Sequence, residues 1–545
     1  MLAITLIALG CRSNDKARVT HAPPVKQAAE TPQAPTEDQL VWPAAHSSEI
    51  GPNACEPTVN AGELPFPVAE AEEVTAVATP QPDEIVASVR DHFPMIREAI
   101  ANRVIASGEA LSAQGAFDRK LEGYSNAQPL DFYENNWHKW GVKRDTMWGG
   151  QVGAGYRIGR GSFEPWYKER ETNDLGEFGV SLTAPIIRDI DIDANRAELW
   201  RAQLERNRVE PIIRAQVLLA IRNGMAAYWE WVAAGANREI AQNVLQLGLD
   251  RVDILERQIE LGEKADIDLV DNQRIIVSRR AKLIDARRKQ QQAAVKLSLF
   301  FRDELGQPLV IPIDGPAPDF PETHLPDEET LADDVDFAVA NRPELEELMV
   351  AQQQLNVAYR QAQNEFLPDV DAGLFLGQDV GNPTSDDDKS EFEIEATLTV
   401  SVPLERRKAR GKIRQVRGKA AQLRAKTQFA SDKVGAEVRV ARAALIAAAE
   451  RVIQTEEGVR LAERMQLAEK RLFDEGQSTL FNLNIREQQT AEAAGNLVAA
   501  QLEYFVASAD YSAALGLETW TPDAGFLING APSRHDGSQG DCEEL

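Results

Sequence analysis

The sequence has no uninterrupted apolar run of about 18 residues, which is the shortest stretch that crosses a bilayer as a helix. A membrane-inserted form of this chain would therefore use a β-barrel, in which neighbouring strands satisfy one another's backbone groups. Cysteine is scarce: Cys11, Cys55 and Cys542 show no CxxC spacing, and the six histidines form no HxxH or HxxxH pair. These spacings do not match those of zinc sites, so we expect no metal site and no cofactor.

Aromatic residues make up only 6% of the 545 residues, whereas charged residues make up 27%. Ala, Gln, Glu and Arg crowd the long middle stretches, a composition typical of long helices rather than of a compact α/β enzyme. No pairing of a nucleophile with a base is recognisable, so we expect no catalytic residues. The formal net charge of −27 argues against a nucleic-acid partner, although a simple soluble acidic protein carries such a charge equally well.

The first residues are typical of an export signal. Residues 2–10 form a short apolar run ending in Ala8-Leu9-Gly10-Cys11, after which the chain turns polar. This pattern predicts a lipoprotein signal peptide, with Cys11 as the lipidated first residue of the mature protein; the alternative is an ordinary export signal with a chance cysteine. We assign residues 1–11 to the signal, residues 12–82 to a disordered tether rich in Pro and Ala, and residues 517–545 to a C-terminal tail.

The middle of the chain repeats itself. Residues 153–159 (GAGYRIG) are matched 218 residues later by residues 371–377 (DAGLFLG), and the offset is the same from residues 180–185 to 398–403. Upstream, residues 92–94 (HFP) correspond to residues 341–343 (NRP) at an offset of 249. The change of offset indicates an insertion of roughly 30 residues, at about 120–150, in the first half only.

Each half therefore reads as a helix, two strands, a long helix, a turn and a second long helix. We assign the first repeat to residues 83–304, with its helical turn near Gly262, and the second to residues 331–516, with its turn near Gly476. Residues 305–330 contain six prolines and are predicted to form an irregular connector around the middle of the helical part.

Four segments alternate with period two between apolar residues and polar or small residues: 151–159, 177–185, 370–377 and 393–403. Their length suits tilted strands that cross a bilayer, although half-buried strands of a soluble sheet alternate equally well. Four strands are too few to close a barrel, which needs about eight, so we expect several chains to pool them. Four tryptophans flank the first strand pair and predict an interfacial aromatic belt: Trp137, Trp140, Trp148 and Trp166.

Residues 186–262 and 404–476 are predicted to form two long helices, because apolar residues recur at helical spacing and only Pro211 interrupts the first pattern. At about 1.5 Å per residue, each would extend for roughly 110 Å. Helices of this length without transmembrane character usually form coiled coils, so a lipid-anchored periplasmic coiled-coil structural protein is the alternative interpretation. A basic run from Arg406 to Lys419 follows the fourth strand; it fits either a solvated helical face or a position near anionic lipid headgroups.

This doubled pattern resembles the TolC-type outer membrane efflux protein (outer membrane factor) family over about residues 83–516. Residues 341–345 (NRPEL), followed by residues 366–368 (FLP), are similar to a frequent pattern of that family. So are the segments around Gly262 and Gly476, each of which opens a helix after a short turn. No single motif is decisive, but the order and the doubling are specific.

The resemblance implies a mainly α fold with a membrane β-barrel. Four strands from each chain of a homotrimer would form a shared 12-stranded barrel, continued by an α-barrel tunnel of long antiparallel coiled-coil helices. It implies passive export of small molecules or proteins across the outer membrane of a Gram-negative-type bacterium, as the exit duct of a tripartite efflux or type I secretion system. The implied partners are outer-membrane lipid, a periplasmic adaptor (membrane fusion) protein that docks at the turns of Gly262 and Gly476, and an inner-membrane transporter.

In this family, acidic rings at the helical tips narrow the periplasmic entrance. By spacing after the turn glycine, Asp268 and Asp271 match these ring positions in the first repeat. Asn482 and Ile485 stand at the corresponding positions of the second repeat, which departs from the family pattern. An acidic residue such as Asp268 at the start of a helix also fits a purely structural role in capping it.

Overall fold

The computed structural model of the chain describes residues 79–163, 170–312, 315, 318–325, 330–383 and 392–520. The predicted lipidation site Cys11, with the whole predicted signal, lies outside these residues, as does Trp166.

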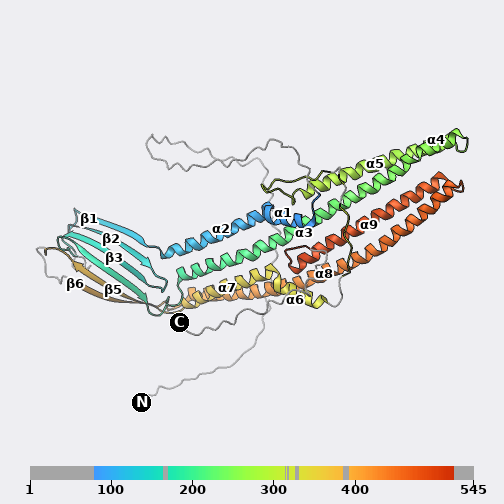
Figure 1. Cartoon of the computed structure of the whole chain (residues 1–545). Helices are drawn as coiled ribbons and strands as arrows, with labels where there is room; N and C mark the ends of the chain where they lie inside the picture. Colours follow the sequence, from blue (N-terminus) through green and yellow to red (C-terminus); the bar gives the residue numbers. More distant parts are fainter. Residues whose placement is uncertain are drawn as a thin grey trace, which may run out of the picture. The chain divides into compact units, whose positions relative to one another are not determined.

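Helices and strands alternate in two similar series. The helices are α1 (Pro82–His92), α2 (Pro94–Gln114), the 3-10 turn η1 (Gly115–Phe117), α3 (Ala194–Asp250), α4 (Val252–Glu260), α5 (Asp266–Leu297), α6 (Leu331–Asn341), α7 (Pro343–Asn364), α8 (Arg407–Asp474) and α9 (Leu480–Leu515). The strands are β1 (Lys120–Gln128), β2 (Asn135–Asp145), β3 (Gln151–Gly161), β4 (Glu177–Pro185), β5 (Asp369–Asp379) and β6 (Phe392–Ser401). The sheet lies at one end of the long helices, and the turns that lead into α5 and α9 lie at the other end (Figure 1).

Two proline breaks occupy equivalent places in the two halves. Proline disfavours the helical conformation of the residue before it, so a helix ends there and a new one begins at the proline. Phe93, before Pro94, has φ −71° and ψ 124°, and Arg342, before Pro343, has φ −66° and ψ 124°. The internal repeat of the sequence is therefore a repeat of backbone geometry.

The long helices are somewhat shorter than the sequence pattern predicted. Residues 186–193 are irregular, and α3 starts where the Asp193 side chain accepts the backbone N–H of Arg196 at 2.8 Å. Helix α3 has 57 residues, contains Pro211 without ending there, and is separated from α4 at Arg251. Helix α8 has 68 residues and at about 1.5 Å per residue extends for roughly 100 Å.

The main core is rich in aromatic rings and lies midway along the helices. Trp229 of α3 is 1% exposed and stacks on Phe505 of α9, with ring centroids 4.2 Å apart. Phe320, from the segment predicted to be an irregular connector, stacks on Trp229 at 5.6 Å, and Trp520 lies 5.4 Å from the same ring. These contacts attach the segment between α5 and α6, and the chain after α9, to the middle of the helices.

The prediction of four strands is wrong, because the sheet has six in the order β1-β2-β3-β4-β5-β6, all antiparallel. The two additional strands, β1 and β2, occupy the segment that the sequence marked as an insertion in the first half. Strand β2 pairs with β3 over its full length, from Asn135 opposite Gly161 to Asp145 opposite Gln151. The insertion is therefore a hairpin that extends the sheet.

The sheet has one apolar and one polar face. The register places the apolar sets of all four predicted strands on the same side, because Ala154 lies opposite Val180, Val180 opposite Leu376, and Leu376 opposite Ile394. Large side chains on this face are exposed: Val180 is 54%, Ile394 63% and Leu398 65% accessible. The opposite face carries mainly Gly, Ser, Thr and charged residues.

The predicted belt of four tryptophans does not form as expected. Trp137 and Trp140 are three residues apart on β2, so they project from opposite faces of the sheet. Trp137 contacts Tyr124 on the polar face, with ring centroids 4.7 Å apart. Trp140 instead begins an aromatic row on the apolar face, where the register aligns it with Tyr156, Phe178 and, on β6, Phe392.

Candidate functional site

The helical tips farthest from the sheet are formed by two turns of the same geometry. Gly262 has φ +75° and Gly476 has φ +71°, a left-handed conformation that suits glycine. In the first turn, Glu263 N–H donates to Gln258 at 2.8 Å and Gly262 N–H to Ile259 at 2.9 Å. In the second turn, the N–H groups of Gln477 and Gly476 donate to the carbonyls of residues 472 and 473 at 2.8 Å and 3.0 Å.

The predicted entrance residues lie just after these turns. Asp268 and Asp271 are one turn apart on α5 and both are partly exposed. Asp271 forms an ion pair with Arg274 at 2.9 Å. Asn482 is exposed on the first turn of α9, where its N–H donates to the Thr479 hydroxyl at 3.3 Å. One chain brings the two aspartates together on one helix and places Asn482 on another, so the ring itself remains a prediction.

The two tips pack against each other through a small apolar cluster. Leu255 of α4 is fully buried against Phe473, Leu480 and Leu483 of the second hairpin. The Lys264 ammonium lies 5.0 Å from the centre of the Phe473 ring. The tips of one chain are therefore held in a fixed pair.

Behind this cluster lies a buried group of charges that joins three helices. Glu487 of α9 is 3% exposed and forms ion pairs with Arg251 and Arg279, both 7% exposed. The Arg279 guanidinium lies 2.6 Å from the second carboxylate oxygen and also donates to the Val244 carbonyl at 2.6 Å. Asn484 accepts from Arg251 at 2.9 Å. We name Arg251, Arg279, Asn484 and Glu487 the tip clamp.

Burial has the largest effect on the pKa of Arg251, one member of the tip clamp. It lowers the pKa of the Arg251 guanidinium, while Glu487 acts in the opposite direction and favours the charged form. A buried charge is stable only when it is paired and hydrogen-bonded, so each member of the clamp depends on the others.

Sequence reasoning did not identify the tip clamp. The available signal was Glu487, which continues the buried stripe of Leu480 and Leu483 at helical spacing. A carboxylate on a buried stripe requires a basic partner, but the partners Arg251 and Arg279 are more than 200 residues distant in the chain. Their proximity is a property of the folded hairpins.

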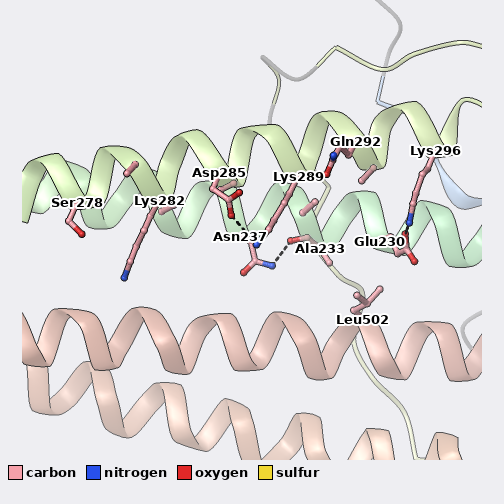
Figure 2. Close-up of a pocket in the computed structure, with 15 residues that line it drawn as sticks. Glu230, Ala233, Asn237, Ser278, Lys282, Asp285, Lys289, Gln292, Lys296 and Leu502 are labelled. Carbon is pink, nitrogen blue, oxygen red and sulfur yellow. Dashed lines mark hydrogen bonds and ion pairs between the residues drawn. The ribbon is translucent and has the colours of Figure 1, made fainter.

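A groove of about 830 Å³ runs along α3 and α5 and opens toward α9 (Figure 2). Its floor is lined by small side chains, including Ala233, Ala293 and Asn237, and its rim by charged ones. Lys296 pairs with Glu230 at 3.0 Å, and Lys289 pairs with Asp285 at 3.1 Å. The groove is open to solvent and four of its charged side chains pair with one another, so the arrangement fits a wetted wall better than an enclosed ligand site.

A second charged group lies on the polar face near the end of the sheet that is farther from the helices. Arg170, in the connection between β3 and β4, approaches Glu393 at 2.7 Å, Glu177 at 3.5 Å and Asp379 at 3.6 Å. Arg157 of β3 pairs with Glu177 at 2.8 Å. The chain before β4 is thus fixed to β4, β5 and β6 by charges on the polar face.

Two further features are absent from the part of the chain that the structure describes. No group of three or more His, Cys, Asp or Glu side chains in this part of the chain is arranged to hold a metal ion. None of its helices combines the length and the apolar character needed to cross a membrane.

Comparisons with known proteins agree with this architecture. No family model and no curated protein sequence matches the chain. Among solved structures, the chain is similar to the outer membrane protein VceC of Vibrio cholerae, with 17% identity, a TM-score of 0.57, and coverage of 80% of this chain and 96% of that one. It is also similar to the Campylobacter jejuni CmeC outer membrane channel, with 13% identity, a TM-score of 0.55 and coverage of 81% and 86%.

The open-state Neisseria gonorrhoeae MtrE outer membrane channel is a third similar structure, with 15% identity, a TM-score of 0.54, and coverage of 81% of this chain and 89% of that one. The chain thus has the fold of outer-membrane channel proteins, and the likeness extends over most of its length. The predicted resemblance to TolC-type outer membrane factors is confirmed at the level of the fold.

Proposed function

We propose that the protein is an outer-membrane channel, the exit duct through which a tripartite efflux or type I secretion system exports small molecules or proteins. The observation that carries this proposal is the sheet, whose apolar face is exposed while its polar face bears charged and small residues. An exposed apolar face of this extent is unfavourable in water, whereas a hydrocarbon layer solvates it. The opposite face then borders a water-filled passage.

The proposed assembly is a homotrimer in which the sheets join into one barrel and the long helices continue the passage into the periplasm. Transport is passive, because an inner-membrane transporter supplies the energy. A periplasmic adaptor is proposed to dock at the tips, where Gly262 and Gly476 end two similar hairpins. Placement in the outer membrane, and a lipid anchor at Cys11, belong to the same proposal.

Charge on the apolar face is expected to block membrane assembly. The Val180 side chain is 54% exposed on the apolar face. Val180→Arg places a cation on this face, which costs about 2–4 kcal/mol near the middle of a bilayer. We expect a several-fold loss of the protein from the outer-membrane fraction, measured by immunoblotting after fractionation. The matched control is Ser181→Arg, one residue further on the polar face, which is expected to assemble normally. Equal loss for both variants would show that the two faces are not distinguished by lipid.

Removing the acidic side chains near the tips is expected to alter the entrance. In the double variant Asp268→Ala with Asp271→Ala, the proposed ring loses two carboxylates per chain, so block of the channel by divalent cations weakens and single-channel conductance rises. The measurement is conductance in planar bilayers. Asp285→Ala is the control, because Asp285 lies further along α5 and pairs with Arg288 at 2.8 Å. Unchanged cation block in the double variant contradicts the ring.

The alternative function is that of a lipid-anchored periplasmic coiled-coil structural protein. Alkaline extraction of the membranes distinguishes it from a channel. An assembled barrel stays in the membrane at alkaline pH after its lipid anchor is removed, whereas a tethered coiled coil is released. Channel activity in bilayers supports the first proposal, and complete release of a monomeric chain supports the alternative.

A further inference from the structure

Among the described residues, the sheet has its two edges at β1 and β6, and β3 lies at neither of them. The outer side of β3 is occupied by β2 from Gln151 to Gly161. In the described part of the chain, β1 pairs only with β2, and β6 only with β5. Copies that share their sheets must therefore meet between β1 and β6, so the inserted hairpin lies at the seam.

The directions of the edge strands suit such a seam. All neighbours in the sheet are antiparallel, so with six strands β1 and β6 run in opposite directions. Strand β6 of one copy then pairs antiparallel with β1 of the next, and the alternation continues without a break. The edges also have similar lengths, 9 residues in β1 and 10 in β6. Pairing satisfies backbone groups that lipid leaves without partners.

The polar faces on the two sides of this seam carry complementary charge. The hairpin bears Lys120, Lys139 and Lys143 on this face, and two of these lysines pair within it, Lys143 with Glu122 at 2.5 Å and Lys120 with Asp145 at 3.8 Å. On β5 and β6 this face bears five carboxylates, and Arg170 and Arg188 pair with three of them; the five are Asp369, Asp371, Asp379, Glu393 and Glu395. The net charges of the two sides still differ in sign, so their contribution to the seam is favourable but small, because most of these groups are already paired within one copy.

The width of the sheet also matches the layer of helices beside it. At the end of the helical part nearest the sheet, α2 packs against α3, α3 against α7, and α7 against α8 (Figure 1). Four helices at 8–10 Å spacing cover an arc of roughly 36 Å, and six strands at about 4.8 Å spacing and about 40° tilt cover roughly 38 Å.

We propose that the partner of both free edges is a second copy of this chain, with β1 of one copy paired to β6 of the next. This proposal rests on the channel function proposed above. In a trimer it gives a barrel of 18 strands, three times the six of one sheet, in place of the 12 expected from four strands per chain. The inserted hairpin is then part of the channel wall and sets its circumference.

Cysteine cross-linking in the outer membrane tests the seam. In a parent with Cys55→Ser and Cys542→Ser, Thr397→Cys on the polar face of β6 is combined, one at a time, with cysteine at each polar-face position of β1. These positions are Lys120, Glu122, Tyr124, Asn126 and Gln128. A short bis-maleimide is expected to convert most of the protein of at least one pair into covalent dimers and trimers, because antiparallel neighbours bring side chains within about 5 Å.

The matched control combines Thr397→Cys with Gln151→Cys on β3, and the parent alone controls for Cys11. Cross-linking through β3 but not β1 overturns the seam and leaves the channel in place, because four strands would then close the barrel. Oligomers that cross-link at none of the β1 positions also overturn it. A chain that is monomeric and inactive in bilayers removes the channel function as well.

Discussion

Replacing Glu487 by alanine is expected to lower the free energy of unfolding by about 3–5 kcal/mol, because it leaves Arg251 and Arg279 buried without their shared carboxylate. The loss is expected to begin at the tips, since the clamp joins the hairpin of α3 to α5 with helix α9. The measurement is thermal unfolding of the detergent-solubilised protein, followed by the helical circular dichroism signal. In bilayers, the same variant is expected to open more often.

Two further variants make this prediction specific. Glu487→Gln keeps the size and hydrogen-bonding atoms of the side chain but loses the charge, so a smaller loss is expected. Glu492→Ala removes an exposed carboxylate five residues later on α9 and is expected to cost no more than about 0.5 kcal/mol. The electrostatic account of the tip clamp fails if Glu492→Ala is as harmful as Glu487→Ala.

Asp334→Ala is expected to destabilise the middle of the helical part by a similar amount, about 3–5 kcal/mol. Asp334 of α6 is fully buried, pairs with Arg442 of α8 (3% exposed), and accepts the Tyr511 hydroxyl of α9. Burial, with Asp334 beside it, raises the pKa of the Tyr511 hydroxyl, which therefore stays protonated and donates. Chemical denaturation monitored by tryptophan fluorescence measures the loss, because Trp229 lies in the neighbouring core.

The control for this site is Asp336→Ala, which removes an exposed carboxylate from the same helix. It is expected to change the free energy of unfolding by less than about 0.5 kcal/mol. Tyr511→Phe tests the hydrogen bond alone and is expected to cost about 1.5–3 kcal/mol, the range for hydrogen bonds to charged groups. A loss for Asp334→Ala no larger than that for Asp336→Ala contradicts the paired burial of Asp334 and Arg442.

The parts of the fold that the sequence predicted well are those with a strong local period. Strands β3 to β6 alternate cleanly, so residues such as Val180 and Leu398 identified both the strands and their apolar face. The turns at Gly262 and Gly476 could be predicted from the sequence, because glycine is suited to the left-handed conformation that ends a helix. The proline breaks likewise follow from a local steric rule.

The sequence did not predict the hairpin β1–β2, because neither of its strands has a continuous row of apolar residues on one face. In β1, Leu121 is followed on its face by Gly123, Ser125 and Ala127, which carry little apolar signal. In β2, Trp137 and Trp140 fall on opposite faces, so their clustering in sequence suggested a belt rather than a strand. What identifies these strands is the pairing of β1 with β2 and of β2 with β3, which the pattern along a single strand does not show.

The candidate sites also differ in whether a local sequence pattern predicts them. Asp268, Asp271 and Asn482 were located by spacing from a glycine, and the structure places them beside the tips without showing a ring. The clamp of Arg251, Arg279 and Glu487, by contrast, depends on three helices meeting, and no local pattern links its members.

The position of the hairpin β1–β2 at the margin of the sheet also affects how the proposed barrel can change in evolution. Because β1 and β2 are consecutive in the chain and join the sheet at its margin, adding them leaves every pairing among β3, β4, β5 and β6 intact. In the proposed trimer, a single insertion or deletion of this hairpin therefore changes the barrel by six strands, two from each copy, while the tips at the other end of the helices stay the same.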